Sequence, residues 1–162
     1  SENVRSSIFG EEYKRHVVEL HRLHILDVTP KNTESWFISR CFSLLKKDRP
    51  DVWAVISFSD TTEGHTGTIY RATNAYFIGT TSSTVFYRDD SGRLRHPRQN
   101  GVNITKKMAE QRGWTAEKRL GKFRYLWIFG ESRKLKKEHI SMCKYNLHNP
   151  YPKGVSNGGT DS

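Results

Sequence analysis

The chain has 162 residues, of which 35% are hydrophobic and 27% charged, so we expect one domain with a modest, aromatic-rich core. No apolar run approaches the roughly 18 residues that a membrane-spanning helix needs, which excludes a membrane-spanning class. The two cysteines show neither metal-ligand spacing nor a disulfide framework. This usage is typical of a reduced, cytoplasmic setting, and Cys41 is expected to be a core residue.

The positive charge is concentrated in one part of the chain. The formal net charge is +10, and residues 91–144 hold 15 lysines and arginines against 4 acidic residues. Aromatic residues are interleaved with these basic residues, at Trp114, Phe123, Tyr125 and Trp127. The segment therefore favours a polyanionic partner, most simply DNA. An ordinary solvated surface is the alternative interpretation.

The first half of the chain predicts a β-α-β unit. Residues 1–13 have weak patterning and are expected to form a loop, whereas 16–27 alternate like a strand. The apolar run 52–58 predicts a strand that is covered on both faces, as in a parallel sheet. Between them a helix is expected over 33–47. Its apolar positions share one face, at Phe37, Cys41, Leu44 and Leu45.

The second half predicts short strands and helices. We expect strands over 76–80, 83–88, 93–96 and 122–129, and helices over 66–74, 106–112 and 132–140. The first of these helices would turn Ile69 and Ala72 inward, and 97–105 would be a loop. The fold class is therefore α/β (α+β), with a mixed central sheet flanked by helices. The expected organisation is an N-terminal extension over 1–15, a domain over 16–152 and a disordered tail over 153–162.

The turn between the first strand and the following helix is a candidate anion site. Backbone N–H groups at a helix start attract phosphate, and Lys31 and the Ser35 hydroxyl would add donors. The chain contains neither GxxxxGK[ST] nor GxGxxG, which excludes a nucleoside-triphosphate loop and a dinucleotide fingerprint. The predicted phosphate contacts are Lys31, Asn32, Thr33, Glu34 and Ser35. An ordinary capped helix is the alternative.

A second group of polar residues follows the second strand, at Asp60, His65, Tyr70 and Asn74. If the two strands are parallel, both turns lie at the same carboxyl edge of the sheet, where α/β proteins place their sites. A phosphate-bearing cofactor on one side and acid/base groups on the other would form a group-transfer site. For each residue alone, helix capping or turn lining is the alternative.

The order of these motifs resembles the Mom family of phage DNA-modification proteins, which are similar to GNAT acyltransferases. The resemblance covers about 18–153 and rests on ELHRLHILDVTPKNTESWF, VISFSD, GHTGTIYRATN, YFIG, FRYLWIFG and NPYPK. It implies a GNAT-like fold that binds acetyl-CoA or a related acyl-CoA. It also implies modification of the exocyclic amine of adenine in double-stranded DNA with an acyl or carbamoylmethyl-type group, which blocks restriction in the host cytoplasm.

The resemblance assigns roles to single residues. Asp60, Tyr70 and Arg22 resemble the family's aspartate, tyrosine and basic residue near the site, and Ser35 resembles a serine that helps to hold CoA. Asp60 is the first choice for the base, or for a group that orients the acceptor, with His65 as the alternative base. Tyr70 would give a proton to the leaving thiolate or hold the intermediate. Asn74 is counted with the cofactor contacts.

Two departures from the GNAT pattern are visible in the sequence. PKNTES lacks both glycines of the usual Arg/Gln-x-x-Gly-x-Gly/Ala turn. The N-terminal half of a GNAT domain has no counterpart before residue 16. We therefore expect a companion chain or segment to complete the fold.

Modification of a base inside a duplex requires the base to leave the stack. The predicted phosphate contacts with DNA are Arg93, Arg95, Arg98, Lys106, Lys107 and Arg112. Two other functions stay open: a non-catalytic DNA-binding or virion-associated module on the same scaffold, and a GNAT-type transferase for another amine. The spacing of the histidines indicates no metal site, so no metal is expected.

Overall fold

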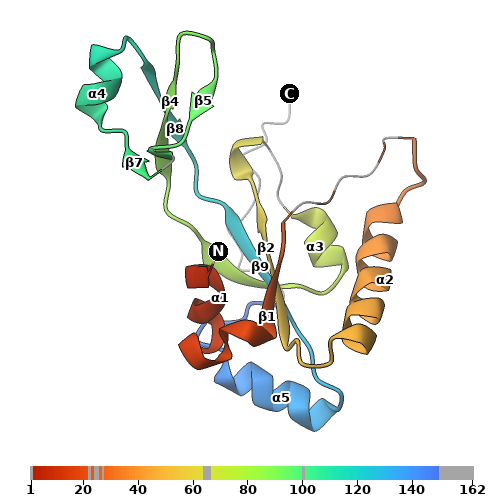
Figure 1. The fold of residues 1–162 in the computed structure, drawn as a ribbon. Coiled ribbons are helices and arrows are strands. Elements are labelled where there is room, and N and C mark those ends of the chain that lie inside the picture. The colour runs from red at the N-terminus through yellow and green to blue at the C-terminus, as the bar shows by residue number, and fades with distance from the viewer. Residues whose placement is uncertain are drawn as a thin grey trace.

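A mixed four-stranded sheet forms the centre of the protein (Figure 1). The computed structural model describes residues 2–21, 23, 26, 28–63, 67–99 and 101–149. The strand order is β1-β2-β9-β3, with β1 (Val17–Leu20) parallel to β2 (Ala54–Ser59). β9 (Phe123–Ile128) runs antiparallel to both β2 and β3 (Tyr76–Thr80). The predicted α/β fold with a mixed, helix-flanked sheet is confirmed.

The central strand β2 is buried on both faces, as its continuous apolar run predicts. Ala54 and Ile56 point into one core cluster, and Val55 points into the other. Burial of a valine or isoleucine side chain such as Val55 or Ile56 stabilises the fold by about 1.5–3 kcal/mol. Since a strand with two covered faces needs helices on both sides, the flanking helices follow from this sequence pattern.

One face of the sheet is covered by α1 (Glu2–Phe9), a 3-10 helix (Glu11–His16) and α5 (Arg133–Met142). The loop predicted for 1–13 is therefore wrong. Ile8 and Phe9 at the end of α1 are 0% and 4% exposed, in the same cluster as β2. Three apolar residues in a short, polar segment give too weak a periodicity for a helix prediction, and tertiary burial stabilises this helix instead. The predicted domain boundaries stay a prediction.

The other face is covered by α2 (Thr33–Asp48) and the short α3 (Thr68–Ala72). The extent of α2 is as predicted, but its inner face is not. The inner positions are Ile38, which is 2% exposed, together with Phe42 and Leu45. Of the predicted inner residues only Leu45 packs inward, while Phe37, Cys41 and Leu44 are exposed.

Two apolar stripes therefore run along α2, about 100° apart, and periodicity alone cannot choose between them. The prediction that Cys41 is a core residue is wrong for the same reason. In α3 the prediction for Ala72 is also wrong, because its side chain is exposed and Tyr70 packs against the core instead.

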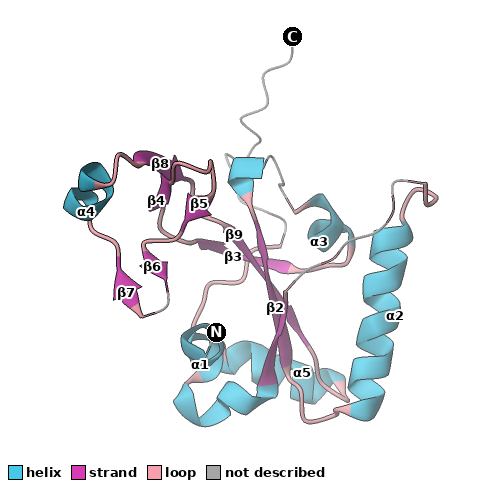
Figure 2. Cartoon of the chain, turned by 45° about the horizontal axis from the view of Figure 1, so that its top comes forward, coloured by secondary structure: helices cyan, strands magenta, loops and turns pink. Residues whose placement is uncertain are grey.

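Between β3 and β9 the chain leaves the body and forms a projecting arm, residues 84–119 (Figures 1 and 2). The hairpin of β4 (Thr84–Arg88) and β5 (Leu94–Arg95) is as predicted, and so is α4 (Lys106–Gln111). β6 (Arg98–Gln99) and β7 (Val102–Asn103) pair within the predicted loop. A small core stabilises the arm, formed by Tyr87, Ile104 and Ala109 with Trp114 against them.

β8 (Thr115–Arg119), which pairs with β4, has no counterpart among the predicted strands. Its sequence TAEKR is polar and mostly exposed, so hydrophobic alternation does not indicate a strand there. Backbone pairing with β4 supplies its stability instead.

The arm meets the body at a joint formed by residues 60–62, 81 and 119–122. Thr81 N donates to the Lys122 carbonyl at 2.9 Å, and Lys122 N donates to Thr81 Oγ1 at 2.8 Å. Thr61 Oγ1 donates to the Gly121 carbonyl at 2.8 Å. A β-carbon at Gly121 would lie 1.7 Å from the Thr81 oxygen, so only glycine allows this crossing.

The predicted disordered tail over 153–162 lies outside the described residues. Among the helices that the structure describes, none combines the length and the apolar character that crossing a membrane requires.

Candidate functional site at the carboxyl edge of the sheet

β1 and β2 end at the same edge of the sheet, because they are parallel and Leu20 is paired with Ser57. The predicted β-α-β arrangement is thus confirmed, with α2 following the first strand and α3 following the second (Figure 1). Two predicted site residues, Arg22 and His65, lie outside the described residues. The remaining predicted catalytic and cofactor residues come from the loops and helices that follow the two strands.

Tyr70 of α3 is held by a serine inside the sheet. Ser57 is 1% exposed, and its Oγ lies 2.9 Å from the Leu20 carbonyl oxygen and 3.0 Å from the Tyr70 hydroxyl. A serine hydroxyl has one hydrogen, so it donates to Leu20 and accepts from Tyr70. The Tyr70 hydroxyl is thereby fixed at the junction of β1 and β2.

Tyr125 of β9 completes this group from the neighbouring strand. Its ring lies 5.1 Å from that of Tyr70, and it is 1% exposed. Burial raises the pKa of Tyr125 to about 12, so its phenol is neutral at physiological pH. Ser57, Tyr70 and Tyr125 are called the hydroxyl cluster below. Sequence analysis assigned no site role to Ser57 or Tyr125, although Ser57 lies in the VISFSD stretch that carries the family resemblance.

Asp60 directly follows β2 and is paired with two cations of the joint. Its Oδ1 accepts from Thr62 N at 3.1 Å, and its Oδ2 lies 3.4 Å from Lys122 Nζ and 3.7 Å from an Arg119 guanidinium nitrogen. Burial would raise the pKa of Asp60, but the Thr62 bond and the two cations outweigh it and hold the pKa below its usual value. A carboxylate with a lowered pKa is a weak base, so this pairing suits an orienting role better. The catalytic role itself stays a prediction.

The predicted phosphate turn at the start of α2 uses its hydroxyl groups internally. Thr33 Oγ1 donates to the Pro30 carbonyl at 2.6 Å, and Ser35 Oγ donates to the Asn32 carbonyl at 3.0 Å. Ser35 therefore offers a ligand lone pairs rather than the predicted donor. Lys31 is exposed, and Asn32 adopts a left-handed conformation with φ of 72° just before the helix. Cofactor binding by these residues and by Glu34 stays a prediction.

Asn74 lies just beyond the C-terminal end of α3. Its backbone is left-handed, with φ of 60°, and its N–H donates to the Arg71 carbonyl at 3.0 Å. Asparagine tolerates this conformation well, so the turn into β3 accounts for the residue type. The cofactor contact predicted for it stays untested.

All six predicted DNA contacts lie in the arm. Arg95 is used internally, because its Nε lies 2.6 Å from Asp89 Oδ2 and braces the hairpin turn. Lys106 Nζ lies 3.8 Å from Glu110. The Arg112 guanidinium lies 5.1 Å from the ring centre of Trp114. The exposed side chains of Arg93, Arg98 and Lys107 lie within reach of a phosphate.

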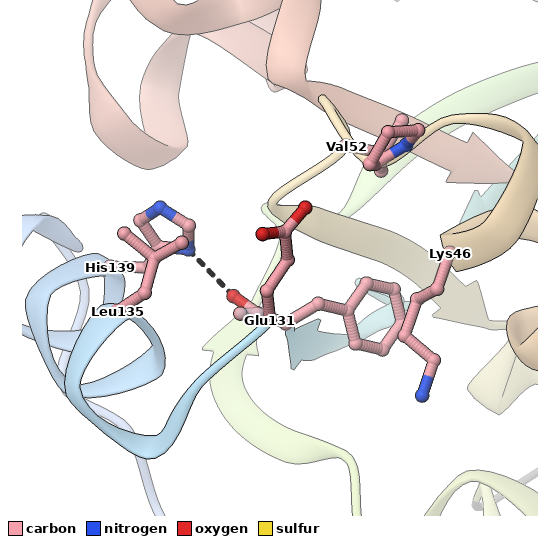
Figure 3. A pocket seen from close by; sticks show the side chains of 8 residues that line it. Lys46, Val52, Glu131, Leu135 and His139 are labelled. Carbon is pink, nitrogen blue, oxygen red and sulfur yellow. Dashed lines mark hydrogen bonds between the residues drawn. The ribbon is translucent and has the colours of Figure 1, made fainter.

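A pocket of about 180 Å³ lies at the opposite, amino end of β2, away from the hydroxyl cluster (Figure 3). It is lined by Lys46, Phe129, Glu131, Leu135 and His139, among others. His139 is 3% exposed, and its Nδ1 lies 2.6 Å from the Phe129 carbonyl oxygen. Across the described part of the chain, no three His, Cys, Asp or Glu side chains gather in a way that would hold a metal.

Comparison with known proteins places the chain in a family. The model of the Mom protein family matches residues 1–153. Methylcarbamoylase mom of Escherichia phage Mu is 37% identical over 79 residues, which are 49% of this chain and 33% of that protein. The matched segment thus spans about a third of the relative's length. Since the family match covers nearly the whole chain, the protein belongs to the Mom protein family.

Proposed function

We propose that this protein modifies double-stranded DNA by transferring an acyl or carbamoylmethyl-type group to the exocyclic amine of adenine. The observation that carries the proposal is that the hydroxyl cluster and Asp60 both lie near the carboxyl end of β2, to which the basic arm is joined. Membership of the Mom family and a relative named methylcarbamoylase support it. The sequence also supports an acyl-CoA donor of the kind that GNAT proteins use.

The start of α2 is well placed to bind the pyrophosphate of such a donor, although only part of its charge is favourable. α2 has 16 residues and begins at the carboxyl edge, beside the exposed Lys31. Lys31, Thr33 and Ser35 would hold the donor, which supplies the activated acyl carbon when it is bound. The acidic Glu34 in the first turn opposes this interaction, as does the internal use of the Ser35 hydroxyl.

The residues of the edge would then divide the proton transfers. The amino nitrogen of adenine loses a proton as it forms its new bond, and Asp60 and His65 are the candidate acceptors. Tyr70 is the candidate donor to the leaving group, and it would break its hydrogen bond to Ser57 when it gives up its proton. Exposed cations of the arm would hold the duplex by its phosphates, without reading its sequence.

A non-catalytic DNA-binding module is the second candidate. The ion pairs of Asp60 and the internal bond of Ser35 favour it, because both groups have structural partners in the absence of any substrate. In that case the arm and the joint carry the function, and the hydroxyl cluster is part of the core.

Mass spectrometry of nucleosides from plasmid DNA tests the choice after expression of the protein in a bacterial host. We expect a heavier deoxyadenosine with the wild type and a loss of roughly 10²- to 10⁴-fold with Tyr70→Phe. Tyr76→Phe is the matched control, because Tyr76 packs in the other core cluster. Unmodified DNA from a wild type that is folded and binds DNA would favour the non-catalytic binding module. Modification of a different amine would show that adenine is not the substrate.

A further inference from the structure

Two cations at the joint share a single carboxylate. Lys122 Nζ and an Arg119 guanidinium nitrogen lie 3.4 Å and 3.7 Å from the same Asp60 oxygen, Oδ2. Both separations exceed the roughly 2.7–2.9 Å of a strong charge-assisted hydrogen bond. The Lys122 side chain is 52% exposed, and those of Arg119 and Asp60 are 24% and 22% exposed. The carboxylate is therefore held loosely, within reach of solvent.

The joint also lies between the two parts of the proposed DNA-modifying surface. Arg119 is the last residue of β8 in the arm, and Lys122 directly precedes β9 of the body. Asp60 follows β2 at the position next to the Ser59–Phe123 pair. A nucleotide that reaches the hydroxyl cluster from a duplex held by the arm must bring its own phosphates past this point.

We propose that Arg119 and Lys122 form a binding site for a DNA backbone phosphate, and that Asp60 occupies this site in the free protein. This inference rests on the proposed function, because it takes DNA as the partner. A phosphate brings a full negative charge and several acceptor oxygens to two cations whose contacts with Asp60 are long. Arg119 Nε also lies 3.7 Å from Glu117 Oε1, so that the phosphate would join Arg119 beside this second carboxylate. DNA binding displaces the carboxylate from the cations.

Displacement has a consequence for the chemistry. While Asp60 is paired with Lys122 and Arg119, its charge is engaged at the joint. Once a phosphate takes its place, the carboxylate becomes available to the amino group of the substrate base. The group needed for orientation or proton transfer is thus released only when DNA is present.

DNA affinity of Asp60→Asn tests the proposal, measured by fluorescence anisotropy with a short duplex, without acyl donor and over a series of salt concentrations. The variant keeps the shape of the side chain and removes its competing charge. We expect several-fold tighter binding than wild type at low salt, with a similar slope of log affinity against log salt, because the same phosphate is bound in both proteins. Adding Lys122→Ala to this variant should abolish the gain.

Asp51→Asn is the matched control, because Asp51 is also ion-paired, with Arg49 at 2.8 Å, but lies at the opposite end of β2. It changes the net charge equally. Equal DNA affinities of the Asp60 and Asp51 variants would overturn the proposal. It would also be overturned if Asp60→Asn bound DNA more weakly and melted at a lower temperature, because Asp60 would then only stabilise the joint. If DNA binding by the wild type did not depend on salt, both this inference and the proposed function would be overturned.

Lys122→Ala alone provides a second test that does not depend on the folding of the Asp60 variant. We expect it to weaken DNA binding by the wild type and to lower the salt slope by about 1. Lys134→Ala, an exposed lysine on α5 at the other end of the sheet, is its control. Equal effects of the two lysine variants would count against a specific phosphate site at the joint.

Discussion

The backbone of Gly67 lies against the ring of Tyr125, so that a β-carbon at Gly67 would be 2.4 Å from Tyr125 Cε2. Gly67 precedes α3 with φ of 74°, a conformation that side chains with a β-carbon rarely adopt. The contact fixes the start of α3, and with it the Tyr70 hydroxyl, relative to the sheet. The position of the candidate proton donor therefore depends on one glycine.

Gly67→Ala should lower both stability and DNA modification. The left-handed backbone costs about 1–2 kcal/mol with alanine, and overpacking against Tyr125 adds about 1–3 kcal/mol. Gly113→Ala is the control, since Gly113 has φ of 69° but open space around it. Urea unfolding measures both variants, and equal losses would show that the contact with Tyr125 carries no energy.

The inner face of α2 can be checked by paired truncations. Ile38→Ala should cost about 2–5 kcal/mol of unfolding free energy, because Ile38 is 2% exposed. Leu44→Ala should cost no more than about 0.5 kcal/mol, because that side chain is 52% exposed. A larger loss of unfolding free energy with Leu44→Ala than with Ile38→Ala would show that the face predicted from periodicity is the buried one.

The turn of the arm hairpin should make stability depend on pH. The Ser91 hydroxyl bond, with Arg95 and the Arg93 N–H, holds the pKa of Asp89 well below its ordinary value of 3.8, although desolvation acts in the opposite direction. A lowered pKa in the folded state means that the contribution is present above pH 3.8 and is lost as pH falls through the folded pKa.

Asp89→Asn should therefore lower the melting temperature at neutral pH, and its difference from wild type should shrink in acid. The exposed Asp90 of the same turn provides the control variant, Asp90→Asn. Thermal unfolding over a pH series measures both. A difference that does not change between neutral and strongly acidic pH would contradict the role of the Asp89 charge.

Trp53 should be a major source of stability, because it lies between two imidazoles. Its ring centroid is 4.1 Å from that of His16 and 4.4 Å from that of His139, with both pairs stacked. Trp53→Leu should lose about 1–3 kcal/mol from the two aromatic pairs, beyond any loss of burial. Trp36→Leu, at a side chain that is 66% exposed, should change the free energy of unfolding far less in the same urea experiment.

The fold was predictable from the sequence wherever a residue pattern is compatible with only one local structure. The apolar run of β2 and the turn residues of the arm hairpin left few alternatives, so these elements appear where they were expected. α2 shows the limit of this reasoning. Two apolar stripes lie on one helix, and only the packing of Phe42 against Trp127, at a ring separation of 5.0 Å, decides which stripe is buried.

The candidate site was predictable in part. The loops after parallel strands indicated Asp60 and Tyr70, because such loops meet at one edge of a sheet. Their partners could not be found in the same way. Tyr125 reaches the cluster only through the pairing of β9 with β2, and Arg95 reaches Asp89 only through the geometry of the hairpin.

The position of the arm separates two properties of this protein. β3 and β9 are adjacent antiparallel strands, so a short turn would be enough to join them, and the arm takes the place of that turn. Both of its connections cross at Gly121, where the backbones touch. We expect changes in the length or charge of the arm outside the joint to leave the pairing of the four-stranded body intact. Selection can therefore alter how the outer part of the arm binds its target, while Arg119 keeps the arm coupled to Asp60 of the body. Arms exchanged at Thr81 and Gly121 would carry their binding preference with them.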